Sequence, residues 1–309
     1  MAQYTILDTI AMQCVLENYG IVGFLSHKIL SGGSENTNYL VKTKSKNYVV
    51  TVCEQKSLEK TIELAFLLEY LERNKFATSK IIKENNKDYI TVWNNKPVMV
   101  KEFIEGSIIE DLPKNLLIAL GKELAKLHRI EAPSYLPKTV SYGIERFDEV
   151  LDYAPNSEFY KWLKTTQKYI EKQINPELPK ALIHSDIFDN NVIVSADRST
   201  ATIMDFEEAC YYYRIFDIGM MIVGLCRSEK QLDLAKMKAI LIGYQQEIQL
   251  VNIEKKALQA FTVYAAAATA FWRHQNFNHV NVDPTMKDHY LEMKQLADAI
   301  MKFPSNSFI

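Results

Sequence analysis

The spacing of hydrophobic residues changes along the chain from a strand-like period to a helix-like one. In the first third, β-rich runs over 39–43 and 48–53 flank a polar turn and predict a hairpin. Two further short strands are expected over 89–93 and 98–104, around an Asn-Asn-Lys-Pro turn. Between these two pairs, apolar residues at helical spacing predict a helix over 58–71. The N-terminal part is therefore expected to be a small sheet with a helix.

Helical spacing dominates the rest of the chain. Leucines recur every three or four residues over 113–129, and helical patterns continue to the C-terminus. One exception is a group of short strands, expected over 181–184, 192–195 and 201–204. We expect an α+β protein with two lobes, a smaller sheet-containing lobe over 1–105 and a larger, mainly helical lobe over 106–309.

Composition and charge narrow the class of protein. The 309 residues are 48% hydrophobic and 24% charged, which are ordinary globular values and exclude a disordered or low-complexity chain. The formal net charge of -2 provides no positive field, so we expect no nucleic-acid partner. No apolar stretch approaches the ~20 residues that span a bilayer, and the first residues lack the pattern of a signal peptide. The four cysteines form no Cys-x-x-Cys pair. We expect reduced thiols, no membrane association and a cytoplasmic location.

The strongest chemical signal lies among the short strands of the C-terminal lobe. The segment His184-Ser-Asp186-Ile-Phe-Asp-Asn-Asn191 precedes one strand, and Asp205 follows another within Met-Asp-Phe. The strands are expected to bring Asp186, Asn191 and Asp205 to one end of a short hairpin. A carboxylate and an amide suit Mg²⁺, and a second carboxylate there can orient a hydroxyl for attack on a γ-phosphoryl group. Each residue alone is typical of a turn or cap, whereas their order between strands favours the catalytic interpretation.

The spacing Asp-x-x-x-x-Asn with a later Asp-Phe resembles the catalytic loop and metal site of protein kinases, without the Arg that precedes the Asp there. Further segments extend the likeness: Glu35-Asn-Thr-Asn-Tyr39, Ala209-Cys210 after the Asp-Phe pair, and Phe271-Trp-Arg273. With them, nearly the whole chain resembles homoserine kinases of the aminoglycoside-phosphotransferase-like type. The resemblance implies a protein-kinase-like fold, with a nucleotide-binding N-terminal lobe and a catalytic and substrate-binding C-terminal lobe.

The resemblance also implies roles for the motif residues. Asp186 is expected to be the catalytic base, with Asn191 and Asp205 as Mg²⁺ ligands. Asp217 corresponds to an Asp that braces the catalytic loop in related kinases, although a helix N-terminal carboxylate is an alternative interpretation. His184 is expected to support the loop, because no second His or Cys lies at metal-ligand spacing.

The sequence signals for the nucleotide site are less distinctive than those for the catalytic motif. A loop of small residues can present backbone N–H groups to ATP phosphates, although Gly-Gly-Ser is also typical of a plain turn. Related kinases place a Lys on the third strand, where this chain has Thr51, so Lys101 or Lys42 is the expected replacement. The inter-lobe hinge is expected to bind adenine through backbone groups. The residues assigned to the nucleotide are Ser31, Gly32, Gly33, Ser34, Lys101, Glu102, Phe103 and Ile104.

The expected reaction is transfer of the ATP γ-phosphoryl group, with Mg²⁺, to the hydroxyl of a small molecule. L-homoserine, giving O-phospho-L-homoserine on the route to threonine, is the first candidate. Arg214 or Arg273 is expected to bind its carboxylate and Glu207 its ammonium, although each is also typical of a surface ion pair. The alternatives are an aminoglycoside, choline or another amino alcohol as acceptor, and a catalytically inactive nucleotide-binding module.

Overall fold

The chain forms two compact units. The computed structural model describes residues 5–30, 36–228 and 231–308. By its internal contacts, the first unit comprises Met1–Gly106 together with Met204–Glu207, and the second comprises Ser107–Ile203 and Glu208–Ile309. The expected phosphate loop, Ser31 to Ser34, lies outside the described residues.

The first unit contains a five-stranded antiparallel sheet in the order β1-β2-β3-β5-β4. Its strands are β1 (Phe24–Ile29), β2 (Asn36–Thr43), β3 (Asn47–Cys53), β4 (Ile90–Trp93) and β5 (Lys96–Glu102). The predicted hairpin is confirmed, since Tyr39 in β2 faces Val50 in β3. Strand β5 ends two residues earlier than predicted. Strand β1 was not predicted, because none of its residues is fully buried and it therefore lacks a strong hydrophobic pattern.

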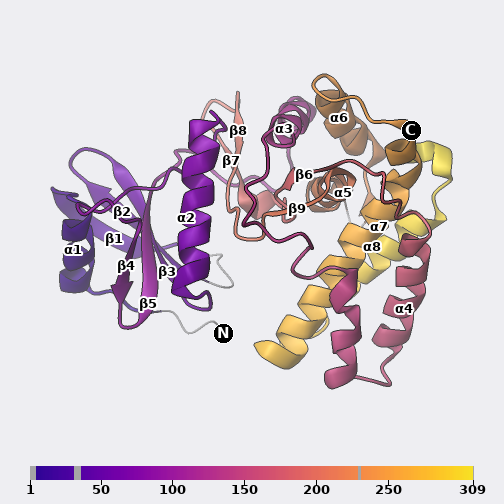
Figure 1. Cartoon of the computed structure of the whole chain (residues 1–309), viewed down its shortest axis with the longest axis horizontal. Helices are drawn as coiled ribbons and strands as arrows, with labels where there is room; N and C mark the ends of the chain where they lie inside the picture. Colours follow the sequence, from indigo (N-terminus) through magenta and orange to yellow (C-terminus); the bar gives the residue numbers. More distant parts are fainter. Residues whose placement is uncertain (1–4, 31–35, 229–230, 309) are drawn as a thin grey trace. The chain divides into compact units, whose positions relative to one another are not determined.

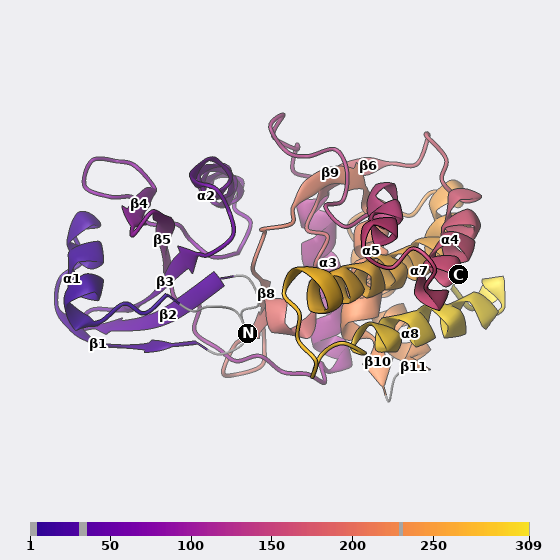
Figure 2. The ribbon, with the colours of Figure 1, turned by 90° about the horizontal axis from the view of Figure 1, so that it is seen from below.

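Two helices pack on opposite faces of this sheet (Figures 1 and 2). Helix α1 (Thr9–Asn18) begins after Asp8, whose carboxylate accepts the Ala11 N–H at 2.8 Å. The core between α1 and the sheet includes Met12, Val15, Leu16, Val41, Val50, Val52, Val98 and Val100. Helix α2 (Leu58–Arg73) begins after Ser57, which accepts the Lys60 N–H at 3.3 Å. Alternate side chains of the central strands are thereby buried on both faces.

The second unit is mainly helical. Its helices are α3 (Lys114–Leu127), α4 (Glu158–Glu171), α5 (Arg214–Leu225), α6 (Leu234–Gln245), α7 (Asn252–Gln275) and α8 (Tyr290–Lys302). Helix α7 has 24 residues, most of them buried, and lies against α5 and α8 (Figures 1 and 2). An apolar helix of this length buried on most sides forms the centre of a large core rather than an amphipathic surface element.

Three short strand pairs complete the second unit. They are β6 (Lys180–Ile183) with β9 (Cys210–Tyr213), β7 (Val192–Val194) with β8 (Ala201–Ile203), and β10 (Arg227–Ser228) with β11 (Gln231–Leu232). The three strands predicted here are confirmed to within one residue at each end. Strand β9 was missed, because a run of three tyrosines carries no alternation of polar and apolar residues.

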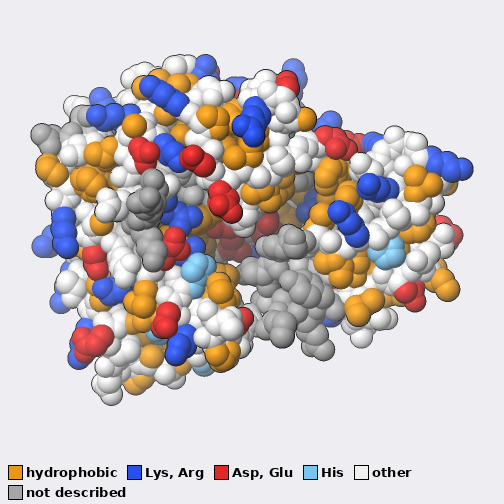
Figure 3. Space-filling model, turned by 180° about the vertical axis from the view of Figure 1, so that it is seen from behind, with side chains coloured by type: hydrophobic (Ala, Val, Ile, Leu, Met, Phe, Trp, Pro, Cys, Tyr) orange, Lys and Arg blue, Asp and Glu red, His pale blue; other side chains and the backbone are white. Residues whose placement is uncertain are grey.

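The surface carries charges of both signs. On the face drawn in Figure 3, Lys and Arg side chains are interspersed with Asp and Glu, in agreement with the net charge of -2. Among the described residues, the helices are too short or too polar to cross a bilayer.

Candidate active site

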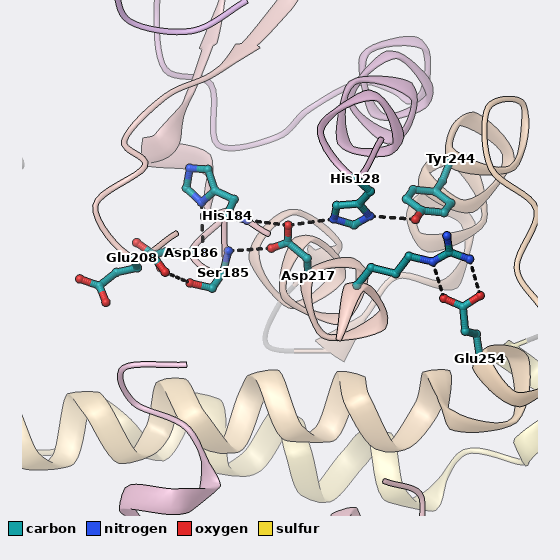
Figure 4. A network of polar contacts seen from close by, with 9 residues as sticks. His128, His184, Ser185, Asp186, Glu208, Asp217, Tyr244 and Glu254 are labelled. Carbon is teal, nitrogen blue, oxygen red and sulfur yellow. Dashed lines mark hydrogen bonds and ion pairs between the residues drawn. The ribbon is translucent and has the colours of Figure 1, made fainter. Parts of the chain in front are cut away.

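The loop that contains Asp186 connects β6 to β7 and is anchored by a buried carboxylate. Asp217, in the first turn of α5 and fully buried, accepts the backbone N–H groups of His184 at 2.8 Å and Ser185 at 2.7 Å (Figure 4). Ser185 has φ +66°, a conformation that costs a non-glycine residue free energy. The two hydrogen bonds to Asp217 hold this turn. The residue therefore lies at a helix N-terminus and also contacts the loop, so both interpretations of Asp217 describe its position.

A buried histidine extends this network. His128, at the end of α3, contacts the Asp217 carboxylate through Nε2 at 3.2 Å and the Tyr244 hydroxyl through Nδ1 at 2.8 Å (Figure 4). The sequence did not predict this partner, because a single His near a helix end carries no pattern of its own. Its contacts connect the loop to α3 and α6.

Two neighbours orient Asp186. His184 accepts the Asp186 backbone N–H at 3.2 Å through Nδ1 (Figure 4). Asn191 donates from Nδ2 to the backbone oxygen of Asp186 at 2.8 Å and to its carboxylate Oδ2 at 3.0 Å. Because Nδ2 is used in this way, the Asn191 Oδ1 oxygen is the part of the amide that remains to bind a cation.

Close backbone packing fixes the loop against α5. A Cβ atom at Gly224 would lie 1.9 Å from the Ile187 carbonyl oxygen, so a side chain there would displace the loop. Only glycine allows α5 and the residue after Asp186 to approach so closely.

In the first unit, Asp205 lies beside a buried ion pair. Asp205 is exposed and has φ +68°. Two residues later, Glu207 contacts Lys56 Nζ at 3.2 Å through Oε2 and accepts a hydrogen bond from Asn36 Nδ2 at 2.5 Å through Oε1. Lys56 also donates to the backbone oxygen of Glu207 at 3.1 Å. Burial and the Asp205 carboxylate raise the pKa of Glu207, and Lys56 opposes this effect. Glu207 was predicted to bind an acceptor ammonium, and the structure instead pairs it with this lysine.

Lys56 is a functional candidate that the sequence analysis missed. It follows β3 by three residues, and this position after the third strand was the only signal in the sequence. Thr51 occupies the strand position expected to hold Lys, and its hydroxyl donates to Asn38 Oδ1 at 2.7 Å. Lys101 is half-buried on β5, and its charge lowers the pKa of Glu207, whereas Lys42 is exposed.

The predicted hinge residues use part of their backbone within the first unit. The Glu102 N–H donates to the Lys80 oxygen at 2.8 Å and the Phe103 N–H to the Asn47 oxygen at 3.2 Å. The Glu102 side chain pairs with Lys46. Among the described residues, no acceptor contacts the Ile104 N–H, which makes Ile104 the hinge donor best placed for a ligand.

The two arginines predicted to bind a substrate carboxylate differ in their contacts. Arg214 forms a bidentate pair with fully buried Glu254, at 2.7 and 2.8 Å. This edge of its guanidinium is used by a structural ion pair and is therefore not available to a substrate carboxylate. Arg273 contacts Glu292 at 2.8 Å. Burial lowers the pKa of Arg273, and the charges of Glu292 and Asp186 oppose this effect. Arg273 is therefore within electrostatic reach of Asp186.

Few of the described side chains are arranged to bind a metal ion. The described residues contain no group of three or more His, Cys, Asp and Glu side chains arranged to hold an ion. Mg²⁺ does not need such a group, since it is commonly bound through one or two protein oxygens together with substrate phosphates and water. The Asn191 amide oxygen in the second unit and the exposed Asp205 carboxylate in the first unit are each oxygen donors of the kind that Mg²⁺ prefers.

The chain is similar to known proteins both in sequence and in fold. The chain is 25% identical to a homoserine kinase of Methylobacillus flagellatus, over 88% of this chain and 86% of the relative. It is also 25% identical to a homoserine kinase of Zymomonas mobilis, over 92% and 91% of the two chains. Among solved structures, a microcompartment-associated aminopropanol kinase superposes with a TM-score of 0.74 at 16% identity, over 97% and 98% of the chains.

A second solved structure has a similar fold, and a family model matches most of the chain. The choline kinase of Streptococcus pneumoniae superposes with a TM-score of 0.68 at 16% identity, over 96% and 100% of the chains. These structural similarities confirm the expected kinase-like fold. Residues 26–247 match the family model described as "Phosphotransferase enzyme family". The chain therefore belongs to the phosphotransferase enzyme family.

Proposed function

We propose that this protein transfers the γ-phosphoryl group of ATP to the hydroxyl of L-homoserine, giving O-phospho-L-homoserine. The observation that carries the proposal is the Asp186 loop, where Asn191 donates to the Asp186 carboxylate and the side chains of His184 and Asp217 accept backbone N–H groups. The homoserine kinase names of the relatives support this acceptor. All four cysteines are free, which fits the cytoplasmic location proposed for this enzyme.

In this proposal, Asp186 accepts a hydrogen bond from the acceptor hydroxyl and receives its proton as the phosphoryl group transfers. Asn191, through Oδ1, and Asp205 are the ligands for Mg²⁺. When bound, Mg²⁺ neutralises charge on the β- and γ-phosphates. The Ile104 N–H is assigned to the adenine.

We assign the cation at the ATP phosphates to Lys56. In protein kinases a Lys–Glu ion pair holds the lysine at the phosphates. Here the third strand has no lysine, whereas Lys56 pairs with Glu207, two residues after the proposed metal ligand Asp205. The Lys56 side chain is only 19% exposed, so its charge is weakly screened by solvent.

Replacing Lys56 with Met is expected to weaken ADP binding by about tenfold or more, because a charge-assisted contact to phosphate is lost. Adenosine affinity is expected to stay unchanged. Calorimetric titration with both ligands measures the difference, with Lys60→Met as the matched control, because Lys60 is an exposed lysine that pairs with Glu63. Normal ADP affinity in Lys56→Met with weakened affinity in Lys101→Met would move the assignment to Lys101.

The substrate is tested by ADP release from Mg-ATP with L-homoserine, choline, ethanolamine and several aminoglycosides, using Asp186→Asn as the blank. We expect saturable turnover with L-homoserine. Turnover with another acceptor instead would keep the phosphotransfer chemistry and refute the homoserine assignment. ATP binding without turnover on any acceptor would favour an inactive nucleotide-binding module.

A further inference from the structure

Two arginines of the second unit share one carboxylate. Arg273, near the end of α7, contacts Glu292 Oε2 at 2.8 Å, and Arg227, at the start of β10, contacts Glu292 Oε1 at 2.6 Å. Glu292 lies in the first turn of α8. Its contact with His289 and the two guanidinium groups lower the pKa of Glu292 to about 2, so the carboxylate is ionised at neutral pH. Because arginine stays protonated in proteins, two positive charges here face one negative charge.

The cluster has an unused hydrogen-bond donor. Among the described residues, the buried Arg227 Nε has no hydrogen-bond partner. Buried donors without partners are rare in proteins because each one costs free energy. An excess positive charge next to an unpaired donor is the environment that an anionic group of a ligand would complete.

The cluster lies beside the catalytic loop. The Arg227 guanidinium lies over the Phe188 ring, 5.6 Å from its centroid, and Phe188 follows Asp186 by two residues. The charge of Asp186 also acts on Arg273. An anion bound by Arg227 and Arg273 would therefore belong to the molecule whose hydroxyl is presented to Asp186.

Resting on the proposed function, we propose that Arg227 and Arg273, held by Glu292, bind the carboxylate of the phosphoryl acceptor. The enzyme then selects hydroxy amino acids over amino alcohols. Choline, ethanolamine and aminopropanol carry no carboxylate and would gain nothing from this cluster. A pair of arginines offers planar, bidentate donors, which suit a carboxylate better than a single ammonium does.

The test compares L-homoserine with L-homoserinol, in which a CH₂OH group replaces the carboxylate. The KM of each acceptor and its calorimetric affinity in the presence of Mg-ADP are measured for wild type, Arg227→Gln and Arg273→Gln. We expect each variant to weaken L-homoserine binding by roughly 10- to 100-fold, with little change for homoserinol or ATP. Arg227→Lys is expected to restore part of the loss. Arg129→Gln serves as the control, because Arg129 is an exposed arginine that pairs with Glu247.

The outcomes separate the two hypotheses. Wild-type turnover of homoserine, with equal losses for both acceptors in a variant that keeps the wild-type unfolding temperature or with no loss in either variant, would overturn the carboxylate site and leave the proposed function standing. Wild type that neither binds nor phosphorylates homoserine, but accepts carboxylate-free alcohols, would overturn both. A thermal unfolding scan of each variant shows whether a loss reflects unfolding, and the homoserinol activity of the same sample must then fall in parallel.

Discussion

Turnover is expected to fall by about 10²- to 10⁴-fold when Asp186 is replaced with Asn, which is the size of a general-base contribution. The amide is nearly the same shape as the carboxylate, so the loop is expected to keep its fold. The amide, unlike the carboxylate, cannot accept the proton of the acceptor hydroxyl. Single-turnover ADP formation at saturating Mg-ATP and homoserine measures the effect on the chemical step.

Asp189→Asn is the matched control for this experiment. Asp189 lies in the same loop, and its replacement removes the same charge. Within the described part of the chain, its carboxylate accepts a single hydrogen bond, from the neighbouring Asn190 N–H at 2.9 Å. We expect its turnover to stay within about threefold of wild type, the size of a small surface effect. Equal losses in both variants would show that loop charge, rather than a base at Asp186, controls the rate. Near-normal turnover in Asp186→Asn would refute the assigned role.

Replacing Asp217 with Ala is expected to destabilise the second unit by about 3–5 kcal/mol, the cost of removing one partner from a buried charged network. The substitution leaves the backbone N–H groups of His184 and Ser185 and a nitrogen of His128 without their acceptor. Urea unfolding measures the free energy. Hydrogen exchange at the Ser185 amide is expected to accelerate, since this N–H then depends on solvent for a partner.

Asp233→Ala is a matched control for Asp217→Ala. Asp233 also accepts two backbone N–H groups, those of Ala235 at 2.8 Å and Lys236 at 3.1 Å, but it caps α6 at a position that is only partly buried. Asp233→Ala is expected to cost only about 1 kcal/mol, as a helix cap does. If Asp217→Ala cost no more than this control, the buried network would not be holding the catalytic loop.

Local patterns in the sequence were sufficient for much of the fold. The β2–β3 hairpin, α2 and α3 follow from residue spacing and turn chemistry, because side-chain periodicity reports which face of an element is buried. The order of Asp186, Asn191 and Asp205 between strands also led to the proposed catalytic chemistry, since all three lie within one short stretch of chain, and their roles remain a prediction.

Contacts between distant residues were decided by the tertiary structure alone. Lys56 and Glu207 lie 151 positions apart, and Arg227 and Glu292 lie 65 apart. Each of these residues alone has the sequence signature of an ordinary surface charge. Burial and pairing distinguish them, and both depend on how the helices and strands pack rather than on the residues beside them in the chain. The sequence therefore determined the elements and the proposed catalytic motif, and packing determined which charged residues pair with one another.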